Sequence, residues 1–249
     1  MRRGGFNFGG NAEVRPGTPV ANAALQERLA FLKRVYGWMS AALVVTVMGA
    51  AISIQSGVAE SLATSGFLGS ILLFVGWIGL GYLVQRMRHI PTWNVVSFAG
   101  YALYTGFVVS TLVFFAMWMA EATGQGAMHY VYMALGATVL VFGTLTVYAM
   151  VTKRDFSWMR GMLIVTLVVL IVGGIANALL FQSTGFGIVL AGLGVILFAG
   201  FILYDTQKIL RTYPSNEHVA AAMTLFIDFV ILFMEILRLI LYIAAAGRE

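Results

Sequence analysis

The sequence contains no cysteine, only four prolines and few charged residues. Asp, Glu, Lys and Arg together make up 10% of the 249 residues, whereas 60% are hydrophobic. A soluble globular domain usually carries about 25% charged residues, so this composition excludes a soluble globular protein. It also excludes a wholly disordered chain, and the lack of cysteine excludes a disulfide scaffold, thiol catalysis and thiolate metal sites. We therefore expect the chain to reside in a membrane.

The sequence also lacks the residue patterns of membrane enzymes. The histidines, His89, His129 and His218, fall in loops or at helix ends, and there is no His-Glu-x-x-His and no phosphate-binding glycine loop. Lys208 lies at a helix end, which argues against a retinal protein. We expect no enzymatic activity and no cofactor. The net charge of +5 is no more than insertion of a multi-span protein requires, so binding of nucleic acid is not predicted.

Seven apolar runs are long enough to cross a bilayer as helices. A hydrocarbon core needs about 20 apolar residues per helix, and runs that are apolar on all sides exclude a β-barrel. We therefore predict an all-α membrane protein, with a seven-transmembrane-helix bundle in residues 21–249. The predicted spans are 35–55, 67–85, 93–120, 130–151, 161–181, 186–207 and 219–243.

The two ends of these spans differ in charge. Thirteen of the fifteen Lys and Arg residues fall on one side, whereas the other side carries Glu60, Glu121 and Arg248. The positive-inside rule predicts a cytoplasmic N-terminus and an external C-terminus. Residues 1–20 show no helical period and are predicted to form a disordered cytoplasmic tail. Such a flexible, basic segment is suited to binding a protein partner.

Ionisable residues lie inside only the last two predicted spans; they are Asp205, Asp228, Glu235 and Arg238. A charged side chain at the centre of a bilayer costs roughly 2.5–3.5 kcal/mol on insertion scales, so each of them requires a reason. Pro214 and Ser215 mark the turn between these spans. Asp205 and Asp228 are equally distant from the middle of that loop. Two antiparallel helices would therefore carry both carboxylates at about the same height.

Two carboxylates in a poorly hydrated site do not both ionise readily, so we expect Asp205 and Asp228 to share a proton and to respond to pH. When both protons are lost, the pair is an oxygen site for a hard cation. Ca²⁺ prefers about six to eight oxygen ligands, so two aspartates predict weak binding, which suits passage of an ion. The alternative is a structural role, in which Arg86 or Arg88, after the second span, pairs with Asp205 and holds helices together.

The last span carries a second polar pattern. Thr224, Asp228, Ile231, Glu235, Arg238 and Tyr242 follow one another at spacings of 4, 3, 4, 3 and 4 residues. This spacing places them on one helix face, which is expected to contact protein or water rather than lipid. We therefore predict that the last helix is central in the bundle. Glu235 and Arg238 are predicted to pair, and a structural role is favoured for them over a functional one.

Three stretches of the chain resemble the Bax-inhibitor family, the transmembrane Bax inhibitor motif proteins. They are residues 141–159 (VFGTLTVYAMVTKRDFSWM), 201–209 (FILYDTQKI) and 225–238 (LFIDFVILFMEILR). The resemblance covers about residues 25–245. It implies a seven-helix bundle around the last helix and a pH-sensitive Ca²⁺ leak, gated by two aspartates that match Asp205 and Asp228. It also implies a basic latch that matches Arg88 or Arg86.

Two functions are compatible with this resemblance. In the first, protonation of the Asp205/Asp228 pair releases the basic latch, and the last or the second helix shifts to open a path for Ca²⁺ or another cation. In the second, the protein is not a channel but modulates a membrane-anchored AAA protease, as some bacterial members resemble modulators or substrates of one. Short loops and the lack of an organelle-targeting signal predict a bacterial inner membrane location, with the first span kept as an uncleaved anchor.

Overall fold

A computed structural model describes residues 25–87, 90 and 92–247 of the chain. Its regular elements are helices, and seven of those in the described part are long and apolar enough to cross a membrane. The elements are α1 (Leu25–Gln55), α2 (Val58–Thr64), α3 (Gly66–Met87), α4 (Trp93–Ala122), α5 (His129–Val151), α6 (Met159–Ala176) with a π-helical turn (Asn177–Phe181), α7 (Thr184–Thr212) and α8 (His218–Ala246). The predicted all-α architecture with seven spans is confirmed.

The helices extend beyond the apolar runs from which they were predicted. Helix α1 begins ten residues before position 35, and α7 reaches Thr212 rather than position 207. Apolar length detects only the part of a helix that lies in hydrocarbon, whereas a helix continues into the polar region wherever its backbone stays hydrogen-bonded. The short helix α2 was not predicted because its seven residues include Glu60, Ser61 and Thr64.

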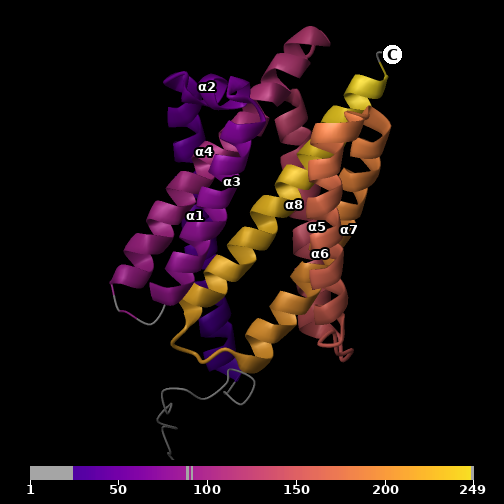
Figure 1. The fold of residues 1–249 in the computed structure, drawn as a ribbon. Helices are drawn as coiled ribbons and strands as arrows, with labels where there is room; N and C mark the ends of the chain where they lie inside the picture. Colours follow the sequence, from indigo (N-terminus) through magenta and orange to yellow (C-terminus); the bar gives the residue numbers. More distant parts are fainter. Residues whose placement is uncertain (1–24, 88–89, 91, 248–249) are drawn as a thin grey trace, which may run out of the picture.

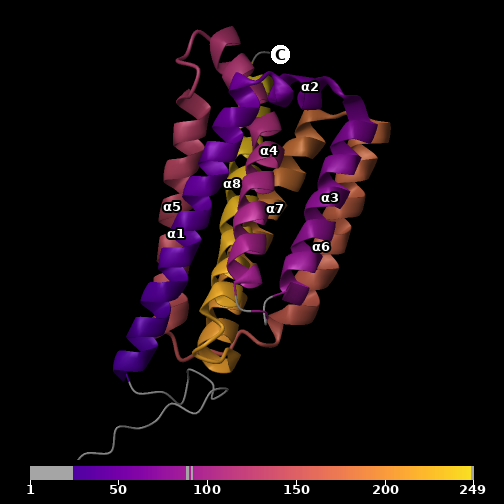
Figure 2. The ribbon, with the colours of Figure 1, turned by 90° about the vertical axis from the view of Figure 1, so that its left-hand side faces the viewer.

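The spanning helices run alternately up and down (Figure 1). The α5–α6 and α7–α8 connections lie at the same end of the bundle as the start of α1, whereas α2 lies across the opposite end between α1 and α3 (Figure 2). We call the first end the basic end. Its basic side chains on α3, α6, α7 and the α5–α6 connection are Arg86, Lys153, Arg154, Arg160, Lys208 and Arg211. Segments far apart in the sequence therefore meet at this end.

Helix α8 packs against α1, α4, α5 and α7. Aromatic rings fasten it on two sides: the ring of Phe226 lies edge-on to that of Phe98 on α4 at 5.5 Å, and the ring of Phe229 lies edge-on to that of Phe142 on α5 at 5.3 Å. Each such pair contributes about 0.5–1.5 kcal/mol beyond the burial of its area. These contacts hold α8 at a defined rotation, which sets the direction of its polar face.

Helices α1 and α4 approach each other at two glycines. A Cβ atom at Gly49 would lie 2.5 Å from the carbonyl oxygen of Leu103, and one at Gly106 would lie 2.7 Å from the backbone nitrogen of Ala50. Nearby, Thr46 Oγ1 donates a hydrogen bond of 3.0 Å to the carbonyl oxygen of Ala102. Small residues that let backbones meet are typical of helix pairs in membranes.

Candidate functional site

The two aspartates of the last two spans lie on neighbouring helices toward the basic end. Asp228 of α8 is 4% exposed, and the side chain of Asp205 on α7 is 13% exposed. Asp228 lies within electrostatic range of both Asp205 and Lys208, and α7 and α8 pack together along their length. The two carboxylates predicted to be at the same height are therefore brought near each other. We call them the aspartate pair.

One buried carboxylate oxygen of the aspartate pair accepts no hydrogen bond from the described residues. Asp228 Oδ2 is buried and makes no hydrogen bond within the described part of the chain, and the same holds for the hydroxyl of Thr206, which follows Asp205. An unpaired carboxylate is costly in a medium of low dielectric constant. A proton shared with the neighbouring acid or a bound cation would relieve this cost, so the site is suited to exchanging the two.

The basic side chain beside the aspartate pair is Lys208. Its Nζ lies 3.9 Å from Asp205 Oδ1, one helical turn away, and 5.7 Å from the centre of the Tyr204 ring. Sequence reasoning did not assign this role, although the i, i+3 spacing of Asp205 and Lys208 was a signal for it. The lysine supplies a positive charge that the pair would otherwise lack.

Of the two arginines predicted as a latch, the structure describes Arg86, and Arg86 does not contact the acids. Arg86 is exposed and donates a hydrogen bond of 3.0 Å from Nε to the hydroxyl of Tyr82 on its own helix, with its guanidinium 5.1 Å from that ring's centre. Arg88 lies outside the described residues. The latch therefore stays a prediction.

The polar face of α8 lies against glycines of α7. A Cβ atom at Gly194 would lie 2.7 Å from Glu235 Oε2, and one at Gly187 would lie 2.5 Å from the Tyr242 ring. Glu235 Oε1 accepts a hydrogen bond of 2.9 Å from Arg238. Two side chains thus occupy space left by glycines of the neighbouring helix.

Thr224 and Arg238, two other residues of the predicted polar face, have surroundings that differ from those of Glu235 and Tyr242. Near the basic end, the Thr224 hydroxyl lies 3.4 Å from the Tyr213 hydroxyl and donates a hydrogen bond of 3.2 Å to the carbonyl oxygen of Ala220. The side chain of Arg238 is 47% exposed in spite of its pairing. The polar face therefore contacts α7 and its C-terminal end, except at Arg238.

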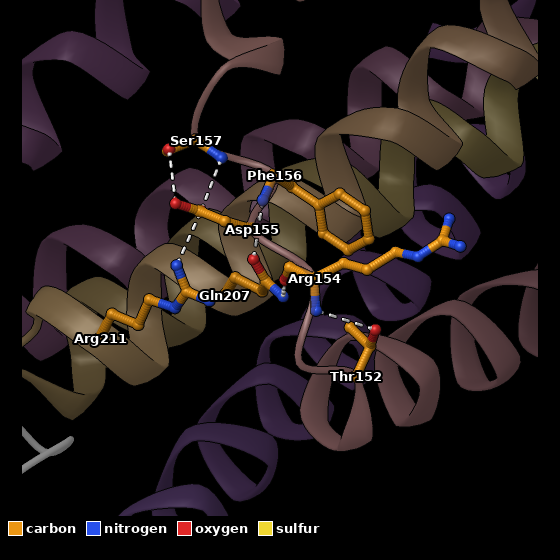
Figure 3. A network of polar contacts seen from close by, with 7 residues as sticks. All are labelled: Thr152, Arg154, Asp155, Phe156, Ser157, Gln207 and Arg211. Carbon is orange, nitrogen blue, oxygen red and sulfur yellow. Dashed lines mark hydrogen bonds and ion pairs between the residues drawn. The ribbon is translucent and has the colours of Figure 1, made fainter.

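A network of polar contacts joins the α5–α6 connection to α7 at the basic end (Figure 3). Gln207 is 5% exposed, and both the oxygen and the nitrogen of its side-chain amide form hydrogen bonds. Its Oε1 accepts a hydrogen bond of 3.1 Å from the backbone N–H of Phe156, and its Nε2 donates one of 2.7 Å to the carbonyl oxygen of Arg154. One turn further along α7, Arg211 Nη1 lies 2.7 Å from Asp155 Oδ1. We call the contacts of Gln207, Arg211 and Asp155 the loop clamp.

Asp155 is held in its charged form by its neighbours. The backbone N–H and the hydroxyl of Ser157 each donate a hydrogen bond of 3.0 Å to its carboxylate. These bonds, together with the charge of Arg211, hold the pKa of Asp155 below its usual range. Residues 152–157 belong to a stretch that resembles the Bax-inhibitor family, but the sequence predicts no role for them. Nothing in the sequence pairs them with α7.

Comparisons with known proteins show the family to which the chain belongs. A family model described as "Inhibitor of apoptosis-promoting Bax1" matches residues 28–245. The chain is 31% identical over 214 residues to an uncharacterized protein of Helicobacter pylori strain J99, covering 86% of this chain and 87% of the relative. It is 29% identical over 225 residues to "Protein lifeguard 4" of Mus musculus, covering 89% of each.

A third relative carries the family name itself. The chain is 28% identical over 224 residues to "Bax inhibitor 1" of Schizosaccharomyces pombe, which covers 90% of this chain and 80% of the relative. The family match includes all seven spanning helices from position 28 onward and both members of the aspartate pair. This multi-pass membrane protein therefore belongs to the Bax inhibitor family.

Proposed function

We propose that the protein is a pH-sensitive leak for Ca²⁺ or another cation, gated by Asp205 and Asp228. The observation that carries the proposal is the buried Oδ2 of Asp228, which has no hydrogen-bond partner among the described residues and lies within electrostatic range of Asp205. A proton and a cation compete for such an oxygen pair. Acidification would therefore change both the charge of the site and its affinity for the ion.

The gate is proposed to work through the charges around the pair. At neutral pH the negative pair attracts Lys208 and a basic latch supplied by Arg86 or Arg88, and these attractions keep the path closed. Uptake of a proton weakens them, and α8 or α3 shifts. In this proposal α8 is the central helix, which is supported by its contacts with α1, α4, α5 and α7. A small rotation of α8 would then change its contacts with helices on several sides of the bundle.

Ion binding at this site is proposed to be weak. Within the described ranges, no group of three or more His, Cys, Asp or Glu side chains is placed to hold a metal ion. Two aspartates supply fewer oxygens than Ca²⁺ prefers, so further ligands must come from water or backbone carbonyls. Weak binding is what a leak requires, because an ion must leave the site as readily as it enters.

The setting proposed for this activity is a bacterial inner membrane, with the basic end and the N-terminus in the cytoplasm. The relative from Helicobacter pylori supports the first point, and the excess of Lys and Arg at the basic end supports the second. The path would then open toward the cytoplasm, on the side where the aspartate pair lies.

The test is Ca²⁺ entry into dye-loaded proteoliposomes that contain the purified protein, followed from pH 8 to pH 5. We expect flux that depends on pH in the unaltered protein, and a flat pH profile for Asp205→Asn and Asp228→Asn. Glu60→Gln is the matched control, because Glu60 is an exposed acid at the other end of the bundle. Its profile should equal that of the unaltered protein.

Two results would overturn the proposal. The first is a pH-dependent flux that neither aspartate variant alters, which would place the gate elsewhere. The second is the absence of flux above empty vesicles at every pH. That result would favour the alternative, in which the protein modulates a membrane-anchored AAA protease and the acids only hold α7 and α8 together.

A further inference from the structure

We propose that Gln207, Arg211 and Asp155 are positioning residues for the gate: they fasten the α5–α6 connection to α7, so that α7 is the fixed side of the aspartate pair and α8 is the side that moves. The inference rests on the proposed function, because it assigns which helix moves when the pair is protonated.

The attachment made by Gln207 is specific. Its two amide atoms bond the backbone of Phe156 and Arg154, which are 51 and 53 positions away in the sequence. A primary amide has a donor side and an acceptor side, so it satisfies both loop groups in only one orientation. The side chain is buried, and rotating it would leave polar groups unpaired away from water. The loop therefore cannot slide along α7 without loss of both bonds.

The clamp lies on the same stretch of α7 as Asp205. Gln207 is two residues after Asp205, which corresponds to about 3 Å along the helix axis, and Arg211 is one turn further on. Both belong to the last two turns of α7, where Figure 3 shows them reaching the 152–158 connection. These contacts add to the direct packing of α7 against α5 and α6 in opposing a displacement of Asp205.

The ion pair of the clamp is built to persist in mild acid. Asp155 receives two hydrogen bonds from Ser157 besides its contact with Arg211, and these partners hold its pKa below the usual range. A carboxylate with a lowered pKa keeps its charge when the pH falls to 5. The clamp therefore remains closed over the range in which the aspartate pair is proposed to take up a proton.

The hydrogen bonds and ion pairs that tie α8 to its neighbours at the same height are weaker than those of the loop clamp. Thr224 is 3.4 Å from the Tyr213 hydroxyl, and Asp228 Oδ2 has no donor in the described part of the chain. Further charged or titratable groups near this end include Lys208 of α7, Arg160 of α6, His218 of α8 and Arg34 of α1, which acts electrostatically on His218. Among the described residues, none of these four groups forms an ion pair that ties α8 to α5 or α6.

The first test measures movement without using flux. Because the sequence has no cysteine, pairs of introduced cysteines can be spin-labelled without background. One pair, Lys153→Cys with Thr212→Cys, joins the loop to the end of α7; a second, Lys153→Cys with Asn216→Cys, joins the same loop to the turn just before α8. All three positions are exposed. On acidification from pH 8 to pH 5 we expect the first distance to stay constant and the second to change.

The same labels test the clamp itself. Gln207→Met keeps the length of the side chain but removes both hydrogen bonds, so the distribution of the first distance should broaden. Gln125→Met is the matched control, because Gln125 is an exposed glutamine in the α4–α5 connection at the opposite end. A constant second distance, or a first distance that changes with pH in the unaltered background, would overturn the inference. So would a first distance left unaltered by Gln207→Met.

Flux provides the second test. Gln207→Met should raise Ca²⁺ entry at pH 8 several-fold and flatten the pH profile, whereas Gln207→Glu, which retains the acceptor for Phe156, should lie between Gln207→Met and the unaltered protein. If Gln207→Met does not fold, the exposed pair allows a double-mutant cycle with Asp155→Asn and Arg211→Gln. An unaltered pH profile in all of these variants would contradict a positioning role. If the unaltered protein carries no flux, the proposed leak fails, while the spin-label distances still decide the clamp.

Discussion

Three aspartates lie toward the basic end of the bundle, and their surroundings give them different properties. Asp228 is buried with an unpaired oxygen, Asp205 is mostly buried beside Lys208, and Asp155 is exposed on a loop with Ser157 and Arg211 as partners. The first two belong to the proposed gate and the third to the clamp. The same side chain thus serves as an exchangeable proton site or as a permanent charge, depending on its donors.

The stability due to Asp155 should depend on pH in a defined direction. Because its pKa is lowered in the folded protein, its contribution is present above the ordinary aspartate pKa of about 3.9 and is lost as the pH falls through the folded value. We expect Asp155→Asn to melt at a lower temperature than the unaltered protein at pH 7 and by the same margin at pH 5, and this difference to vanish only in stronger acid.

Thermal unfolding in detergent micelles at a series of pH values measures this difference. Glu60→Gln, which alters an exposed acid of α2, should melt like the unaltered protein throughout. A difference for Asp155→Asn that is already lost at pH 5 would show that the carboxylate is protonated in mild acid. The clamp would then not be independent of the gate.

At the scale of elements, the packing of helix pairs depends on where glycines stand. The crossing of α1 and α4 requires glycine at positions 49 and 106, because backbone atoms of the partner helix fill the space of a Cβ atom. The contact of α7 with α8 requires glycine at positions 187 and 194 for the side chains of Tyr242 and Glu235. Other glycines of the same helices, such as Gly100 and Gly192, face open space.

Two alanine substitutions in α4 should therefore have opposite effects. Gly106→Ala places a methyl group against the backbone of α1 and should destabilise the fold by about 1–3 kcal/mol, as overpacking does. Gly100→Ala meets no atom within 4 Å and should stabilise it by about 0.5–1 kcal/mol, because alanine favours helix more than glycine does. Equilibrium unfolding in mixed micelles measures both. Equal effects of the two changes would contradict the close approach of α1 and α4.

At the scale of the whole molecule, the distribution of charge sets the proposed sidedness. The connections at the basic end carry Lys and Arg, whereas Glu60 and Glu121 lie toward the other end. Insertion of membrane helices leaves basic loops in the cytoplasm. The aspartate pair, the loop clamp and the proposed opening of the path would then all face the cytoplasm.

Labelling of single cysteines in intact bacteria tests this orientation. The chain has no cysteine of its own, so Glu60→Cys and Lys153→Cys each introduce one reactive thiol at an exposed position. A membrane-impermeant maleimide should modify Glu60→Cys in intact cells, but Lys153→Cys only after the inner membrane is permeabilised. The reverse pattern would invert the topology and place the aspartate pair near the external face.

The bundle was predictable because its spans are apolar over their whole length, and the aspartate pair because Asp205 and Asp228 are equidistant from one turn. Gln207 was not predictable as a clamp, since a glutamine near a helix end has no preferred partner in the sequence. Its partners at positions 154 and 156 belong to another helix connection. The i, i+3 spacing of Lys208 and Asp205 would have allowed Lys208 to be predicted as the basic partner. The sequence analysis instead placed that partner after the second span.

The sequence by itself determined the membrane setting, the seven spans and the family, because apolar length, charge distribution and local motifs are properties of contiguous residues. Only the tertiary structure decided which groups of different elements meet, such as Gln207 with the α5–α6 connection and Glu235 with Gly194. The physical reason is that the hydrophobic effect that inserts a helix is insensitive to its rotation. Rotation is set by close packing and by single hydrogen bonds between helices, whose partners are distant in the chain.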